Sequence, residues 1–121
     1  MNNKILVVDD DVTSLDIVDL VLEGAGYDVV RATNGQSAVA GVQEANPDLI
    51  IIDLMMPHMS GQEAVRQIRS KGVQVPIVAF TALDDPGVHQ EAREAGCDRI
   101  VTKPCKPRDL VKGIKDLLEN S

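Results

Sequence analysis

Side chains able to bind a metal ion or take part in phosphoryl chemistry recur directly after short apolar runs of this sequence. In chain order they are Asp9, Asp10, Asp11, Asp53, Thr81 and Lys103. Clustered carboxylates repel one another, and their pKa values rise unless a cation is shared between them. If the fold gathers these side chains, a divalent ion would relieve that repulsion.

Phosphoryl transfer is the chemistry that this set of residues suits. Two carboxylates and a backbone carbonyl match the oxygen ligands that Mg²⁺, or Mn²⁺, takes. One oxygen of Asp53 would remain free to attack phosphorus. The reaction spreads negative charge over the phosphoryl oxygens, which the Lys103 ammonium and the Thr81 hydroxyl could stabilise.

Each residue also has a simpler interpretation. The acids at 9–11 could cap a helix, since acids favour its positive end, although three in succession exceed what capping needs. Asp53 could be a turn residue before Pro57. His58 and His89 have no partner at metal-ligand spacing, and we expect both to be solvated.

The elements that must position these residues form an alternating pattern. β-Branched runs occur at residues 5–8, 29–30, 49–52, 75–80 and 99–101, with helical periodicity between them. Such alternation predicts an α/β protein with a parallel sheet covered on both faces. Ligands bind at the carboxyl ends of the strands of such a sheet, where the candidate residues lie.

Helix boundaries are also readable. Ser60 and Glu63 form a Ser-x-x-Glu capping box, and Pro86 and Pro107 occupy first helical positions. The helix that begins at Pro86 offers the core only three small apolar side chains, which are Val88, Ala92 and Ala95. We expect it to be the most loosely packed helix.

Composition narrows the functional classes. A chain of 121 residues fits one domain, residues 1–121. The net charge of −7 disfavours direct binding to nucleic acid or to an anionic membrane. No run is long enough to be a signal peptide or a membrane span. Cys97 and Cys105 lack metal-ligand spacing and are expected to be reduced thiols, which indicates the cytoplasm.

Four short motifs resemble those of the receiver domains of bacterial two-component response regulators, in the same order and spacing. They are VVDDD at 7–11, IDLMMPHMSG at 52–61, Thr81-Ala82 and Lys103-Pro104. The resemblance covers the whole chain and is closest to single-domain chemotaxis regulators. It implies a flavodoxin-like, doubly wound sheet of five parallel strands in the order 2-1-3-4-5, with five helices.

The resemblance also implies a role for each site residue. Asp53 would be the phosphoacceptor, and Asp9, Asp10, Asp53 and the backbone carbonyl of Met55 would hold Mg²⁺ or Mn²⁺. Thr81 and Lys103 would contact the phosphoryl group, with a cis peptide bond before Pro104.

The implied partners follow from the same resemblance. The donor would be a phosphohistidine on a sensor histidine kinase or a phosphotransfer protein. A downstream protein or a second copy would bind the face formed by the fourth helix, fifth strand and fifth helix. Whether the 121 residues act alone or within a longer regulator or hybrid kinase stays open.

Three positions depart from the family pattern. Ile100 stands where an aromatic residue commonly turns inward on phosphorylation, so the switch would depend on Thr81 and the loop at Leu83. Met55 and Leu83 are apolar where the family often has polar groups that help to orient an attacking water. We therefore expect slow self-dephosphorylation.

Three other functions compete with this one. A flavodoxin-like nucleotide or flavin binder would need a Ser/Thr/Gly-rich phosphate loop where this chain has acids. An aspartate-dependent phosphohydrolase usually carries a second Asp two residues after its nucleophile, where this chain has Met55. A scaffold without phosphorylation chemistry would not need the complete set of acids, threonine and lysine.

Overall fold

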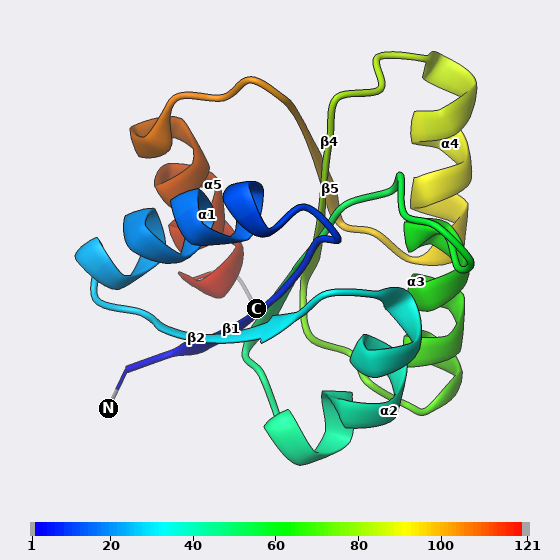
Figure 1. Cartoon of the computed structure of the whole chain (residues 1–121), viewed down its shortest axis with the longest axis horizontal. Coiled ribbons are helices and arrows are strands. Elements are labelled where there is room, and N and C mark those ends of the chain that lie inside the picture. Colours follow the sequence, from blue (N-terminus) through cyan, green and yellow to red (C-terminus); the bar gives the residue numbers. More distant parts are fainter. Residues whose placement is uncertain (1, 120–121) are drawn as a thin grey trace.

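The computed structural model describes residues 2–119 as a five-stranded parallel sheet flanked by five helices (Figure 1). The strands are β1 (Lys4–Val8), β2 (Asp28–Ala32), β3 (Leu49–Ile52), β4 (Ile77–Thr81) and β5 (Arg99–Thr102). The helices are α1 (Val12–Gly24), α2 (Gly35–Ala45), α3 (Gly61–Ser70), α4 (Pro86–Ala95) and α5 (Pro107–Glu119). The strand order β2-β1-β3-β4-β5 confirms the predicted fold class.

Helices cover both faces of the sheet. In Figure 1, α1 and α5 lie together on one side, and α2, α3 and α4 lie on the other. The central strand β3 has no polar residue because both of its faces are buried. Leu49 and Ile51 pack in the cluster under α1 and α5, whereas Ile50 and Ile52 pack in the cluster under α2, α3 and α4.

The predicted helix starts are mostly confirmed. Ser60 caps α3 by accepting a hydrogen bond from the Glu63 amide at 3.2 Å. The Glu63 carboxylate accepts from Arg66 and Gln67 at 3.5 and 3.1 Å and not from a backbone amide, so the structure forms only the Ser60 half of the predicted capping box. Pro86 is the first residue of α4, as expected.

Strand β4 begins at Ile77, two residues later than the apolar run indicated. Pro76 has no amide hydrogen for a strand ladder. The carbonyl of Val75 accepts a hydrogen bond from Arg69 Nη1 at 2.8 Å. Hydrogen bonding to β3 therefore begins at the Pro76 carbonyl, which accepts from the Ile50 amide at 3.0 Å, and strand pairing begins at Ile77.

Helix α4 is thinly packed, as predicted. Only Ala92 and Ala95 are buried on it, and the partly buried Val88 packs against the same core. Its C-terminal end is held by Arg69, which donates through Nη2 to the Gly96 carbonyl at 2.8 Å and to Asp98 at 3.0 Å. The helix therefore has a firm end and a lightly packed one.

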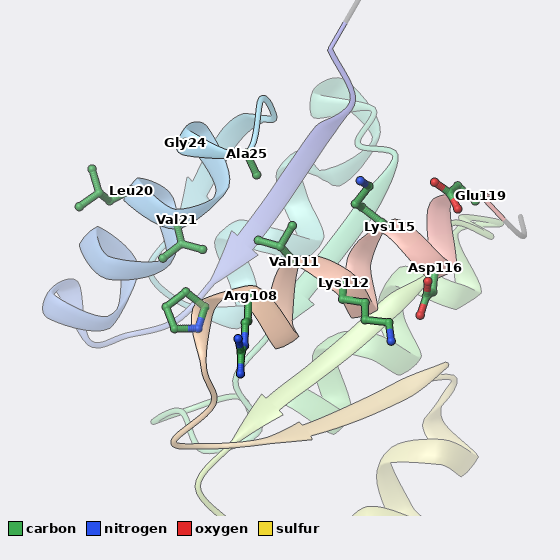
Figure 2. Close-up of a pocket in the computed structure, with 11 residues that line it drawn as sticks. Leu20, Val21, Gly24, Ala25, Arg108, Val111, Lys112, Lys115, Asp116 and Glu119 are labelled. Atoms are coloured by element: carbon green, nitrogen blue, oxygen red, sulfur yellow. The ribbon is translucent and has the colours of Figure 1, made fainter.

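A groove of about 680 Å³ runs between α1 and α5 (Figure 2). Leu20 and Val21 line it from α1, and Arg108, Val111 and Lys112 line it from α5. None of the side chains predicted to do chemistry lines this groove.

Candidate functional site

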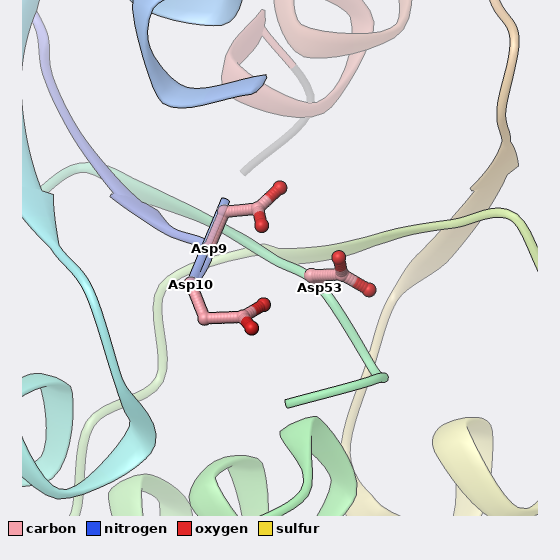
Figure 3. Close-up of side chains that lie close together, drawn as sticks. All are labelled: Asp9, Asp10 and Asp53. Carbon is pink, nitrogen blue, oxygen red and sulfur yellow. The ribbon is translucent and has the colours of Figure 1, made fainter. Parts of the chain in front are cut away.

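The order of the strands brings the two acidic segments together. Strands β1 and β3 are neighbours, with Val8 paired to Ile52, so Asp9 and Asp53 follow adjacent strand ends. One carboxylate oxygen from each of Asp9, Asp10 and Asp53 lies within 4.8 Å of the other two. Figure 3 shows the three carboxylates projecting to the same side of the chain.

The three consecutive acids divide between two tasks. Asp11 caps α1, because its carboxylate accepts hydrogen bonds from the Thr13 amide at 3.0 Å and the Ser14 hydroxyl at 3.1 Å. Asp9 and Asp10 instead join Asp53, Asp9 buried and Asp10 exposed. The capping interpretation is therefore correct for Asp11, and it leaves the other two acids available to the site.

Lys103 follows the edge strand β5, and its side chain extends past the end of β4 to reach this cluster. Its Nζ lies 3.1 Å from Asp9 Oδ2 and 3.3 Å from Asp53 Oδ2. Its backbone N–H donates to the Thr81 carbonyl at 2.7 Å, which ties the end of β5 to the end of β4. The peptide bond from Lys103 to Pro104 is cis, as the resemblance implied.

Burial and charge perturb both members of the central ion pair. The pKa of Asp53 is raised, mainly because the carboxylate is buried. The hydrogen bond from the Met55 amide and the charge of Lys103 act to lower this pKa, whereas the charge of Asp9 acts to raise it. Burial acts to lower the pKa of Lys103, but the Asp53 and Asp9 carboxylates outweigh it, and the pKa is raised. The three clustered carboxyl groups, two of which contact the Lys103 ammonium, have the donor chemistry for a divalent cation.

The loop after Asp53 is folded tightly against it. The Met55 amide donates to Asp53 Oδ1 at 3.0 Å, and the Met55 side chain is exposed. At Gly61, a Cβ atom would lie 2.4 Å from the Asp53 carbonyl oxygen and 2.7 Å from Leu54 Cα. Only glycine fits that approach, which explains the glycine at the end of the motif.

Thr81 lies at the end of β4 and is fully buried. Its Oγ1 accepts a hydrogen bond from the Leu83 amide at 3.1 Å. The hydroxyl hydrogen is not used in that bond, so Thr81 can still donate to a ligand. Ile100 is half-buried and packs in the cluster under α2, α3 and α4.

His89 was wrongly predicted to be solvated. It is half-buried, and its Nε2 lies 2.8 Å from the Leu83 carbonyl. Because a carbonyl only accepts, the ring nitrogen is the donor. The partner is a backbone group six residues earlier, which the absence of a metal-ligand partner in the sequence does not reveal.

Phe80 is a second residue that sequence reasoning missed. The Lys103 ammonium lies over its ring, 5.1 Å from the centroid. The sequence marks Phe80 as one of only two aromatic residues, but its contact depends on the strand order.

No helix among residues 2–119 combines the length and the apolar character needed to cross a membrane.

Comparisons with known proteins agree with this geometry. The family model "Response regulator receiver domain" matches residues 5–115. The chain is 37% identical, over its full length, to the alkaline phosphatase synthesis transcriptional regulatory protein PhoP of Bacillus subtilis. It covers 50% of that protein, so the chain spans about half the length of this curated relative.

Two solved structures are similar over nearly the whole chain. Chemotaxis protein CheY4 of Vibrio cholerae has a TM-score of 0.92 and 34% identity, covering 97% of this chain and 99% of that one. The receiver domain of sensor histidine kinase PA1611 of Pseudomonas aeruginosa has a TM-score of 0.90 and 28% identity, covering 98% and 99%. That structure has a magnesium ion coordinated in its active site cleft. The chain belongs to the response regulator receiver domain family of two-component signalling.

Proposed function

We propose that residues 1–121 form one receiver domain in which Asp53 accepts a phosphoryl group from a phosphohistidine. The donor is a sensor histidine kinase or a histidine phosphotransfer protein. The observation that carries the proposal is the position of Lys103 Nζ, which contacts Asp53 and Asp9 at once. Such a bridge draws together the nucleophile, a metal ligand and a cation able to stabilise phosphoryl oxygens.

The acidic cluster suits a divalent cation, Mg²⁺ or Mn²⁺. Asp9, Asp10 and Asp53 would hold it through carboxylate oxygens, with the Met55 backbone carbonyl as a further ligand. The three carboxylates offer the oxygen donors that such ions take, and burial together with the Asp9 charge acts to raise the pKa of Asp53, so a nearby cation would favour its ionised form. When bound, the ion supplies positive charge that offsets the carboxylates and the phosphoryl oxygens.

The chain's own residues divide the reaction between them. An Asp53 carboxylate oxygen forms the new bond to phosphorus while the phosphorus–nitrogen bond of the donor breaks, and the imidazole nitrogen keeps the electron pair. The Met55 amide fixes Asp53 Oδ1, which orients the carboxylate. Lys103 neutralises charge on the phosphoryl oxygens, and the Thr81 hydroxyl donates a hydrogen bond to them.

Phosphorylation would shift the population between two conformations of the face formed by α4, β5 and α5. The Thr81 hydroxyl links to Leu83 at 3.1 Å, and Leu83 links to His89 of α4 at 2.8 Å. A hydroxyl drawn toward the phosphoryl group would therefore pull on the start of a thinly packed helix. Ile100 would repack without an aromatic ring, and a downstream protein or a second copy would bind the altered face.

We further propose that the domain is a switch with slow turnover and not a phosphohydrolase. Met55 and Leu83 provide no polar side chain to orient an attacking water. The domain would act in the cytoplasm, without binding a membrane. Residues 1–121 would not contact nucleic acid themselves, because their net charge of −7 repels phosphates.

Labelling tests the proposal directly. The wild-type chain, incubated with acetyl phosphate and Mg²⁺, should gain one phosphoryl group that persists longer than minutes, and chelation should abolish labelling. Asp53→Asn should not be labelled. Asp11→Asn is the matched control: it keeps the α1 cap, since Asn caps as well as Asp, and should be labelled normally. Labelling of Asp53→Asn, or rapid release of phosphate, would contradict the proposal.

A further inference from the structure

The ammonium of Lys103 has a neutral neighbour besides its two carboxylates. It lies over the face of Phe80, 5.1 Å from the ring centroid. A cation within about 6 Å of an aromatic centroid is attracted by the negative face of the ring. Lys103 therefore makes three contacts, to Asp9, Asp53 and Phe80.

The sheet order explains why a residue of β4 lies under this side chain. Lys103 follows β5, whereas Asp53 follows β3 and Asp9 follows β1. Because β4 separates β5 from β3, the lysine must cross the end of β4 to reach either acid. Phe80 is the next-to-last residue of β4 and is paired with Val101 of β5.

Packing fixes the ring. Phe80 is half-buried and packs in the apolar cluster beneath α1 and α5, on the same face as Val78. The Lys103 side chain is only 22% exposed, so it is largely removed from water. The attraction between a cation and an aromatic ring is stronger when the cation is desolvated. A fixed ring beside a flexible lysine can restrict where the ammonium lies.

Phosphoryl transfer changes the Asp53 contact of Lys103 but leaves the Phe80 ring chemically unchanged. When Asp53 becomes an acyl phosphate, one carboxylate oxygen is bonded to phosphorus, and its ion pair with Lys103 is replaced. The ring of Phe80 takes no part in the reaction and keeps the same charge distribution throughout. It can hold the ammonium in one place while the anion beside it changes.

We propose that Phe80 is a positioning residue for Lys103, its ring face holding the ammonium where it meets the phosphoryl group on Asp53. This inference rests on the function proposed above. It assigns the ring a role that Ile100 cannot fill, since Ile100 packs on the opposite side of the sheet.

The first test observes the contact without any phosphodonor. In the NMR spectrum of the wild-type protein, the ε-methylene protons of Lys103 should be shifted upfield by the ring current of Phe80. The shift should persist in Phe80→Tyr and vanish in Phe80→Leu and Phe80→Met, the second of which guards against a leucine variant that fails to fold. An unshifted Lys103 resonance in the wild type would overturn the inference.

The second test measures the consequence. At saturating acetyl phosphate and Mg²⁺, Phe80→Leu and Phe80→Met should be phosphorylated about threefold to tenfold more slowly, and Phe80→Tyr within about twofold of wild type. Val78→Ala, which weakens the same face of β4 without touching Lys103, should keep the wild-type rate. Equal rates for Phe80→Leu and Phe80→Tyr would overturn the positioning role. Failure of the wild-type protein to be labelled would instead refute the proposed function, while the NMR result would still stand.

Discussion

Asp53 shows how one residue balances burial against charge. Its carboxylate is fixed by the Met55 amide and by Lys103, yet burial dominates and its pKa lies above the ordinary value. A carboxyl group with a higher pKa in the folded than in the unfolded state binds protons more strongly when folded. Its ionisation therefore costs stability above the folded pKa, and that cost fades as the pH falls toward the ordinary aspartate pKa of 3.8.

This sign leads to a prediction about Asp53→Asn. With the metal chelated, the variant should unfold a few degrees higher than wild type at pH 7, and the difference should shrink as the pH is lowered. Adding Mg²⁺ at about 100 times its Kd should stabilise the wild type by about 2.7 kcal/mol and the variant by clearly less. Thermal unfolding from pH 4 to 8, with and without Mg²⁺, checks both statements. A variant less stable than wild type at pH 7 without metal would show that the Lys103 ion pair outweighs burial.

Gly61 offers a prediction that concerns the backbone alone. In Gly61→Ala, the new Cβ would meet the Asp53 carbonyl at 2.4 Å, so the loop carrying Asp53, the proposed phosphoacceptor, must shift. We expect a loss of roughly 2 to 4 kcal/mol in the free energy of unfolding and slower phosphorylation. Gly41→Ala is the matched control, because no atom lies within 4 Å of a Cβ there and alanine favours the interior of α2 by about 0.5 to 1 kcal/mol. Urea unfolding measures the free energy of unfolding of both variants. Similar values for Gly61→Ala and Gly41→Ala would contradict the steric argument.

At the scale of elements, Arg69 determines how α4 is held. Its guanidinium donates to the carbonyls of Val73, Val75 and Gly96 as well as to Asp98, joining the end of α3 to the end of α4. Gly96 has a φ of 126°, and a Cβ there would meet Arg69 at 2.9 Å, so the arginine fills the space beside the helix end. The N-terminal end of α4 is capped by Asp85, is tied to the preceding loop by the hydrogen bond from His89 to the Leu83 carbonyl, and has a light core. We therefore predict that any movement of α4 pivots about its C-terminal end.

Arg69→Met should remove this anchor. The side-chain stem is retained while several carbonyls lose a charged donor, which should lower the free energy of unfolding by about 2 to 3 kcal/mol. Arg66→Met is the matched control on the same helix, because its ion pairs with Glu63 and Glu91 are long, at 3.5 and 3.6 Å, and exposed. Such pairs contribute about 0 to 1 kcal/mol. Equal losses in urea unfolding would mean that Arg69 is no stronger an anchor than a surface ion pair.

Most of these helices and strands can be predicted from the sequence because residues within each element determine its structure. The apolar run at 49–52 predicts a strand buried on both faces. Ser60 and Pro86 mark helix starts, because the Ser60 hydroxyl accepts from a free backbone amide and proline lacks the amide hydrogen that would have no partner there. The start of β4 was misplaced because Arg69, several residues earlier, takes the Val75 carbonyl. The contacts of Phe80 and His89 were missed for a related reason. Each depends on where a neighbouring strand or loop lies, which periodicity does not encode.

For the whole molecule, α4 buries fewer residues than any of the other four helices. On one face, α1 and α5 each bury three residues, including Leu15, Leu22 and Ile114. On the other, α4 buries two alanines, and its start is linked to the end of β4 through Leu83. A perturbation at Asp53 should therefore spread toward α4 and β5 and leave α1 and β2 largely unchanged, because motion follows the elements with the least buried contact.

Hydrogen exchange with beryllofluoride and Mg²⁺ tests this asymmetry. Amides of the loop at Leu83, of the first turns of α4 and of β5 should change their exchange rates severalfold, while those in the middle of α1 and β2 should not. The physical reason is the chain of contacts from Thr81 through Leu83 to His89, which ends on the lightly packed end of α4. In His89→Phe, the Leu83 amide should respond as in wild type, but the response of α4 should weaken, because the ring no longer donates to the loop. Changes confined to the residues around Asp53, or an α4 response that survives the loss of His89, would show that the helix is moved by another route.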